Sequence, residues 1–218
     1  MKKVLLVAAF AVSVLGYSQS NSEGTIHINL LGGFAFGGNV TDKYTEENVS
    51  YEDKYKFASG TYGLNVHYGL NDKISVGLGL TTGAYVLTPK NLTSLDGFGT
   101  FGASTTMSLF NINAQSRYYI LNDDDLNIYG GVNVGFASAT DKFAGFDLST
   151  DSYKASGLSY GVNVGLNYYY WEKVGGNIQL GYEGAGLSGD YKYDGGSYTQ
   201  KRSIGGINFM AGLAIKIN

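Results

Sequence analysis

Alternation between apolar and small or polar residues, with a period of two, runs through most of this 218-residue chain. Residues 25–37 set Ile26 and Leu30 on one face against His27 and Asn29 on the other. Because successive side chains of a β-strand point to opposite faces, the pattern predicts a strand with one apolar and one polar face. The pattern recurs, and we expect eight strands, over residues 25–37, 59–70, 74–85, 105–121, 126–138, 157–169, 174–184 and from 204 to the carboxyl end.

The composition agrees with a chain built almost entirely of strands. It contains 33 glycines and 19 tyrosines but a single proline. Glycine is a poor helix former, tyrosine favours strands, and scarce proline leaves the hydrogen bonds of a β-ladder intact. The length fits one domain.

The first residues have the features of an export signal. Two lysines precede an apolar run over residues 4–15, and small residues follow it. This predicts a signal peptide over residues 1–18, cleaved before Gln19, which leaves one domain over residues 19–218.

Charge and cysteine content exclude several classes of partner and cofactor. The chain has 15 basic and 18 acidic residues, and loss of Lys2 and Lys3 with the leader gives a net charge of −5. An acidic chain is a poor ligand for nucleic acid, so we expect no nucleic-acid partner. The absence of cysteine excludes a lipid anchor on cysteine, a disulfide framework and a thiolate metal site.

The connections between the strands alternate in length. Short turns follow Leu70, Leu121 and Tyr169. No stretch after the leader reaches 18 apolar residues, so any crossing of a membrane must use strands. We therefore expect an all-β, eight-stranded antiparallel up-and-down transmembrane β-barrel with short periplasmic turns. Its four long extracellular loops would cover residues 38–56, 86–102, 139–156 and 185–203.

The polar face of the strands identifies which side meets lipid. It is rich in glycine and asparagine but poor in lysine and glutamate, which makes a weak surface for a soluble protein. A soluble, lipocalin-like barrel would turn its apolar face inward. We favour the membrane arrangement, in which the apolar face meets lipid and the polar face lines the lumen.

Aromatic residues cluster where membrane interfaces are expected. Those near the short turns predict one interfacial girdle. Phe36, Tyr85 and Phe136 would mark the opposite rim, and the pair Gly205–Gly206 predicts a β-bulge in the last strand. The girdle near the short turns consists of Tyr68, Tyr118, Tyr168, Tyr170 and Trp171.

Three local features carry a family resemblance: the segment 116–119 (Ser-Arg-Tyr-Tyr) ending the fourth strand, the near-repeat of 131–135 in 161–165, and the alternating final strand. With the strand rhythm, they resemble the small outer-membrane β-barrel superfamily of bacteria, which includes OmpX, the OmpA membrane domain and the opacity-like proteins. The resemblance implies location in the outer membrane and insertion by the barrel-assembly machinery. The carboxyl end departs from the family pattern, because Ile217 stands where phenylalanine is common.

Six polar residues are expected to form a structural cluster in the lumen, namely His27, His67, Gln115, Arg117, Glu183 and Lys216. His27 and His67 lie on neighbouring strands, but without a cysteine or an obvious carboxylate at that depth we expect hydrogen-bonded histidines and not a metal site. We expect Arg117 to close the lumen, with Gln115, Tyr119 and Asn127 as partners, rather than to select ions.

No catalytic or cofactor-binding residue is expected. A membrane-embedded lipid or peptide hydrolase would need a serine beside a histidine, and no serine stands at such a position. The function that we expect is structural or surface-interacting, in adhesion or envelope integrity, with lipid and an extracellular ligand of the loops as partners. A narrow channel for small solutes or ions is the alternative.

Overall fold

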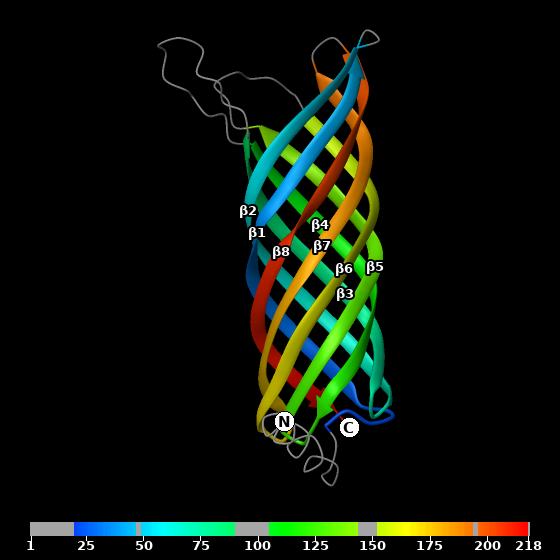
Figure 1. Ribbon diagram of the computed structural model, residues 1–218, viewed down its shortest axis with the longest axis vertical. Coiled ribbons are helices and arrows are strands. Elements are labelled where there is room, and N and C mark those ends of the chain that lie inside the picture. Colours follow the sequence, from blue (N-terminus) through cyan, green and yellow to red (C-terminus); the bar gives the residue numbers. More distant parts are fainter. Residues whose placement is uncertain (1–19, 47–48, 90–104, 144–151, 194–195, 218) are drawn as a thin grey trace, which may run out of the picture.

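The computed structural model describes residues 20–46, 49–89, 105–143, 152–193 and 196–217. The expected signal peptide lies outside the described residues. The described chain forms eight antiparallel strands (Figure 1): β1 (Ile26–Glu46), β2 (Val49–Asn71), β3 (Ile74–Pro89), β4 (Thr105–Asn122), β5 (Leu126–Phe143), β6 (Ser152–Trp171), β7 (Val174–Tyr193) and β8 (Gly196–Ile217).

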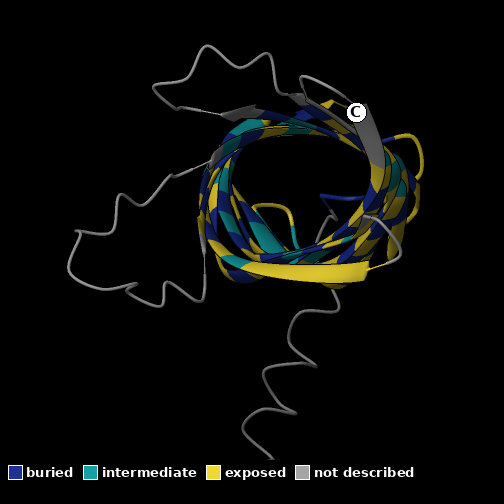
Figure 2. Cartoon of the chain, turned by 90° about the horizontal axis from the view of Figure 1, so that it is seen from above, coloured by how far each residue is buried: buried dark blue, intermediate teal, exposed yellow. Residues whose placement is uncertain are grey.

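The strands close into a barrel. Each one pairs with its neighbour in the sequence, and β1 pairs with β8 along most of its length. The view along the axis shows the resulting ring (Figure 2). The predicted eight-stranded up-and-down barrel is therefore confirmed. Within the described part of the chain, no helix has the length and apolar character needed to cross a bilayer.

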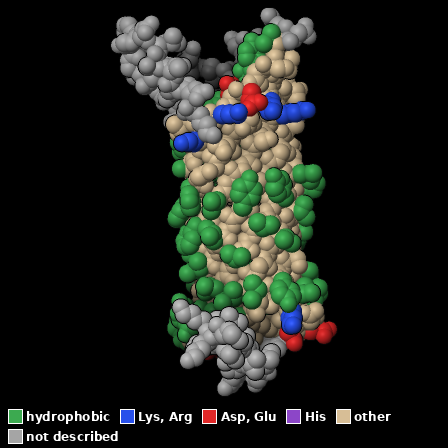
Figure 3. Space-filling model, in the orientation of Figure 1, with side chains coloured by type: hydrophobic (Ala, Val, Ile, Leu, Met, Phe, Trp, Pro, Cys, Tyr) green, Lys and Arg blue, Asp and Glu red, His purple; other side chains and the backbone are tan. Residues whose placement is uncertain are grey.

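Burial alternates along every strand as the sequence predicts. On β2, Thr61, Asn65 and His67 are buried in the lumen, whereas Tyr62 and Val66 are exposed on the outside. The apolar side chains gather on the outer surface in its middle and lower parts, as Figure 3 shows. We call this surface the apolar belt; its members include Leu30, Phe34, Tyr62, Leu78, Ile112, Val134, Phe136, Val162, Leu180 and Leu213.

The predicted girdle near the short turns is part of this surface. Tyr68, Tyr118 and Tyr168 are exposed, and Trp171 has the largest exposed fraction of the group, 73%. Tyr168 and Tyr170 pack edge to face, with ring centroids 5.0 Å apart. The girdle therefore faces outward at the lower end of the barrel.

The strands are longer than predicted and replace most of two expected loops. They contain 16 to 23 residues, whereas about 9–11 residues suffice to cross a bilayer. The expected loops 38–56 and 185–203 are almost wholly strand, because β1 continues to Glu46 and β7 to Tyr193. Beyond the belt the outward side chains are polar, so the apolar signal that located the strands fades. The interiors of the expected loops 86–102 and 139–156 lie outside the described residues.

The predicted bulge is present on a different strand. Between Phe36 and Asn39, β1 advances three residues while β8 advances two, and no register shift interrupts β8 against β7. The extra residue sits beside Gly37, whose φ of 65° is the left-handed conformation that glycine adopts without strain. The expectation of a bulge at Gly205–Gly206 was wrong, because these glycines oppose the bulge instead of forming it.

Tyr85 corrects the expected upper rim. Phe36 and Phe136 are exposed as predicted, but Tyr85 is buried in the lumen. It shares its face of β3 with the lumenal residues Ser75 and Gly77, and Val86 takes the outward position. The alternation of β3 turns its odd-numbered residues inward, so the position of Tyr85 near a strand end does not make it interfacial.

Candidate functional site

The lumen is the place where polar side chains converge, and its lower part holds a hydrogen-bonded network. His27 on β1 bonds through Nδ1 to the Tyr169 hydroxyl on β6 at 2.8 Å and through Nε2 to the Asn21 side chain at 3.1 Å. On the next inward position of β1, Asn29 donates to Asn167 at 3.1 Å. These contacts join opposite walls of the barrel, so they fill the lumen.

Two cations sit in this lower network, as predicted. Arg117 donates to the side-chain oxygen of Asn29 at 2.9 Å and its guanidinium lies 4.2 Å from the centre of the Tyr129 ring. Lys216 lies 5.0 Å from the centre of the Tyr169 ring and donates to a backbone oxygen at 3.3 Å. Of the three expected partners, Tyr119 hydrogen-bonds to Arg117 through its side chain. The hydrogen bonds of Gln115 and Asn127 within the described residues go to other groups. Neutral oxygens and aromatic faces thus hold both cations.

His67 and Gln115 complete the lower cluster. His67 lies directly opposite His27 in the register of β1 and β2. Gln115 donates to Asn65 at 3.0 Å and to Asn113 at 2.7 Å. No group of three or more metal-ligating side chains occurs among the described residues. The cluster is an amide and imidazole network.

The segment before β1 closes the lower mouth of the barrel. Ser20 and Asn21 are fully buried, although they precede the first strand. Ser20 hydrogen-bonds to Asn127. The Asn21 side chain donates to the backbone oxygen of Asn71 at 2.6 Å, and the backbone oxygen of Asn21 accepts a hydrogen bond from the Asn122 side chain at 2.7 Å. Asn122 is the last residue of β4, so the end of this strand anchors the segment. The alternation did not reveal this role.

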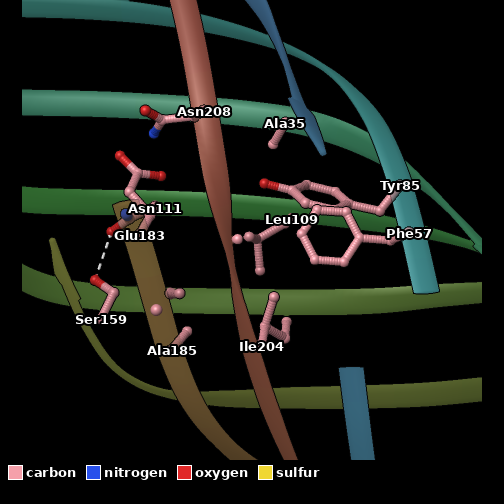
Figure 4. A pocket seen from close by; sticks show the side chains of 13 residues that line it. Ala35, Phe57, Tyr85, Leu109, Asn111, Ser159, Glu183, Ala185, Ile204 and Asn208 are labelled. Carbon is pink, nitrogen blue, oxygen red and sulfur yellow. Dashed lines mark hydrogen bonds between the residues drawn. The ribbon is translucent and has the colours of Figure 1, made fainter. Parts of the chain in front are cut away.

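Glu183 lies higher than this network, in the middle of the lumen. It lines a cavity of about 30 Å³, and Asn111, Ser159 and Asn208 are on the same polar side (Figure 4). Ser159 donates to Asn111 at 2.8 Å. Among the described residues, Glu183 and Arg117 do not form an ion pair.

Apolar side chains fill the lumen above the cavity. Phe57 and Tyr85 pack with ring centroids 5.2 Å apart. Most outward residues above the belt are polar or small, with Val86 as an exception, so the barrel here has an apolar inside and a mainly polar outside, as a soluble barrel does. We call this cluster the upper core; it consists of Ala35, Val40, Phe57, Tyr85, Leu87, Met107, Ala137, Ala139, Tyr153, Ala155, Ala185, Leu187 and Ile204.

A buried ion cluster braces the upper core. Arg202 on β8 binds Asp42 on β1 through two contacts of 2.6 and 2.7 Å, and Asp141 on the opposite strand β5 through two of 2.7 and 2.8 Å. The guanidinium lies 4.5 Å from the centre of the Tyr153 ring. Burial opposes the charge of Arg202, but the hydrogen bonds of both carboxylates outweigh it and raise the pKa of the guanidinium above its ordinary value.

Sequence reasoning missed this ion cluster because all three residues fell in expected loops. Continuing the alternation would have found two of them: Arg202 shares parity with Asn208 and Lys216, and Asp141 with Asn133. Asp42 gave no such signal. Only the bulge at Gly37 turns the even positions of β1 inward beyond it.

These features define what the lumen can do chemically. Three levels of side chains close it: the lower network, the upper core and the ion cluster. His27 bonds to Tyr169 and Asn21, and the neighbour of His67 for a side-chain hydrogen bond is Gln115. Neither ring is therefore bonded to a serine as a nucleophilic pair requires.

Comparison with known proteins identifies the fold. No protein-family model matches the chain, and no curated protein matches it in sequence. The crystal structure of the outer membrane protein OprG from Pseudomonas aeruginosa is similar with a TM-score of 0.71 at 15% identity, covering 92% of this chain and 100% of that one. The outer membrane protein AlkL, solved by solid-state NMR in DMPC bilayers, has a TM-score of 0.56 at 16% identity, covering 93% and 94%. The chain thus has the fold of small outer-membrane β-barrels.

Proposed function

We propose that this protein is an integral outer-membrane barrel with a closed lumen, which has a structural or surface-interaction role and no catalytic one. The observation that carries the proposal is the combination of an apolar belt outside with a lumen filled at three levels inside. A barrel of this kind holds its extracellular surface in the membrane and does not conduct solutes through its lumen.

The belt supports insertion into a bilayer. Side chains such as Val162 and Phe136 are more than half exposed, and no described part of the chain covers them. Water would make such a continuous apolar surface aggregate, whereas lipid accepts it, and the closed ladder leaves no unpaired strand edge in the bilayer. Lipid is therefore the first proposed partner, with the barrel-assembly machinery as the partner during insertion. The signal peptide over residues 1–18 belongs to the same proposal.

The filled lumen supports a structural role over the alternative of a narrow channel. A permeant ion or solute would have to pass the lower network, the upper core and the ion cluster. Because eight strands enclose an interior that side chains can fill, no large rearrangement is needed for this closure. A channel would require several of these contacts to break together.

The upper parts of the strands support an interaction role. Above the belt, β1 and β2 continue together, and Tyr44 stacks on Tyr51 with centroids 5.2 Å apart. Beside this pair lies an open groove lined by Lys43, Glu52 and Lys201, among others. Recognition surfaces commonly sit on such extensions of a rigid scaffold. We propose that an extracellular ligand binds here.

Orientation in the membrane can be tested with single cysteines, since the chain has none. Spin labels at Val162→Cys, in the belt, and Lys154→Cys, above it, should differ: the first should be accessible to oxygen dissolved in lipid and the second to a water-soluble nickel chelate. The refolded protein should also migrate as a folded band that shifts on boiling. Equal access of the chelate to both labels would mean that the apolar face is not in lipid.

Conductance separates the structural role from the channel. In planar bilayers we expect the folded protein to give no channel steps. A control is the same preparation after boiling, which reports detergent artefacts. Reproducible steps from the folded protein that are absent from the boiled sample would replace the structural role with the channel.

A further inference from the structure

Glu183 is a carboxylate enclosed in the barrel without a cationic partner. The Asn208 side chain hydrogen-bonds to it, and no described lysine, arginine or histidine forms an ion pair with it. Removing an ionised carboxylate from water is costly unless an opposite charge or several donors compensate. One amide donor compensates little of this cost, so a negative charge on Glu183 lacks a neutralising partner among the described residues.

The cationic side chains of the lumen contact groups other than Glu183. Arg202, above the cavity, is bound by two carboxylates, so that ion cluster carries an excess of one negative charge. Arg117 and Lys216 belong to the lower network, where Asn29 and a backbone oxygen hold them. When Glu183 is ionised, the middle and upper lumen carries a net negative charge, and a cation in the cavity would compensate it.

The atoms around the cavity are suitable ligands for a hard cation. The polar side of the cavity is lined by Glu183, Asn208, Asn111 and Ser159, whose side chains carry carboxylate, amide and hydroxyl oxygens, and apolar side chains line the rest (Figure 4). The side-chain oxygen of Asn208 is buried and has no hydrogen-bond partner within the described chain. It provides an independent indication of a missing neighbour, since buried polar atoms normally have one.

Size and charge limit the occupant. About 30 Å³ is room for one or two water-sized species. Oxygen ligands select hard cations, and divalent ions in such sites usually require more than one carboxylate. We propose that the cavity at Glu183 binds a single small monovalent cation of the alkali type, with Glu183 as its anionic ligand.

Salt-dependent stability tests the site. The protein and Glu183→Gln are refolded in detergent with NaCl or, at equal ionic strength, with tetramethylammonium chloride, whose cation is too large for the cavity. Urea unfolding then gives the folding equilibrium constant. For the unmodified chain the constant should rise about tenfold for each tenfold rise in Na⁺ above the Kd, as linkage requires, and should not respond to tetramethylammonium. Glu183→Gln should show no selective response and should be the more stable form without Na⁺.

Two controls make the test decisive. Glu52→Gln removes an exposed carboxylate far from the cavity and should retain the full Na⁺ response. Infrared spectra of the protein and Glu183→Gln report whether the Glu183 carboxyl carries a proton. An ionised carboxylate in NaCl agrees with the site. A protonated carboxyl in saturating NaCl, or equal stabilisation by the two salts, overturns it.

Discussion

Replacing Arg202 by methionine should destabilise the upper part of the barrel more than other single substitutions there. Methionine keeps much of the side-chain length but removes the charge that compensates Asp42 and Asp141. The side chains of the two carboxylates are 4% and 1% exposed. Both would then lie buried and uncompensated, one on β1 and the other across the lumen on β5.

The magnitude follows from the contacts. Four hydrogen bonds between charged groups are lost, each worth about 1.5–3 kcal/mol. The sum overstates the effect because the cluster also had to be desolvated. Breaking a buried ion pair by removing one partner typically costs about 3–5 kcal/mol, which is the loss in free energy of unfolding that we expect.

Amide hydrogen exchange is the suitable assay because the loss should be local. The chain has a single tryptophan, Trp171, at the opposite end of the barrel, so its fluorescence reports on the wrong region. In Arg202→Met, protection should fall by about two to four orders of magnitude for the upper pairs of β1 and β8, such as Thr41 with Ser203. Protection in the belt should change little.

A compensated variant provides the matched control. The triple variant Arg202→Met, Asp42→Asn, Asp141→Asn removes all three charges, so no uncompensated charge remains and most of the protection should return. If the single variant keeps its protection, or if the triple variant loses as much as the single one, the ion cluster does not brace the barrel as we reason.

Three further predictions follow from other parts of the structure. Gly212→Ala should lower the free energy of unfolding by about 1–3 kcal/mol, because its Cβ would overlap the backbone oxygen of Leu30. Gly130→Ala, with nothing within 4 Å of its Cβ, should be neutral in urea unfolding, and equal effects of the two variants would contradict the packing argument. Arg117→Ala should cost about 2 kcal/mol in the same assay through its lost amide and aromatic contacts, yet open no channel in planar bilayers, since the upper core still closes the lumen; new channel steps would show that the lower network alone is the barrier. Side-chain hydrogen bonds from Lys54 and Lys43 lower the pKa of Glu52, so in an NMR titration its carboxylate should protonate below its ordinary pKa. The small stabilisation by these pairs should be lost as pH falls through that lowered pKa. Titration of Glu52 at its ordinary pKa would argue against persistent pairing.

The sequence by itself determined the strand number, the antiparallel order and the faces of the strands. A period of two is a property of the extended backbone, so it can be read without knowing any neighbour. For that reason His27, His67, Arg117 and Lys216 were placed correctly in the lumen, and the girdle around Trp171 on the outside.

Only the tertiary structure decided which residues meet across the lumen. Partners such as Arg117 and Asn29, or Arg202 and Asp141, come from strands that are not neighbours, and their heights depend on the tilt and register of the whole closed sheet. The bulge at Gly37 shows the same limit: one extra residue reverses the faces of β1 beyond it and brings Asp42 inward. Local alternation cannot reveal such a reversal, because the extra residue is defined only against the strands on either side.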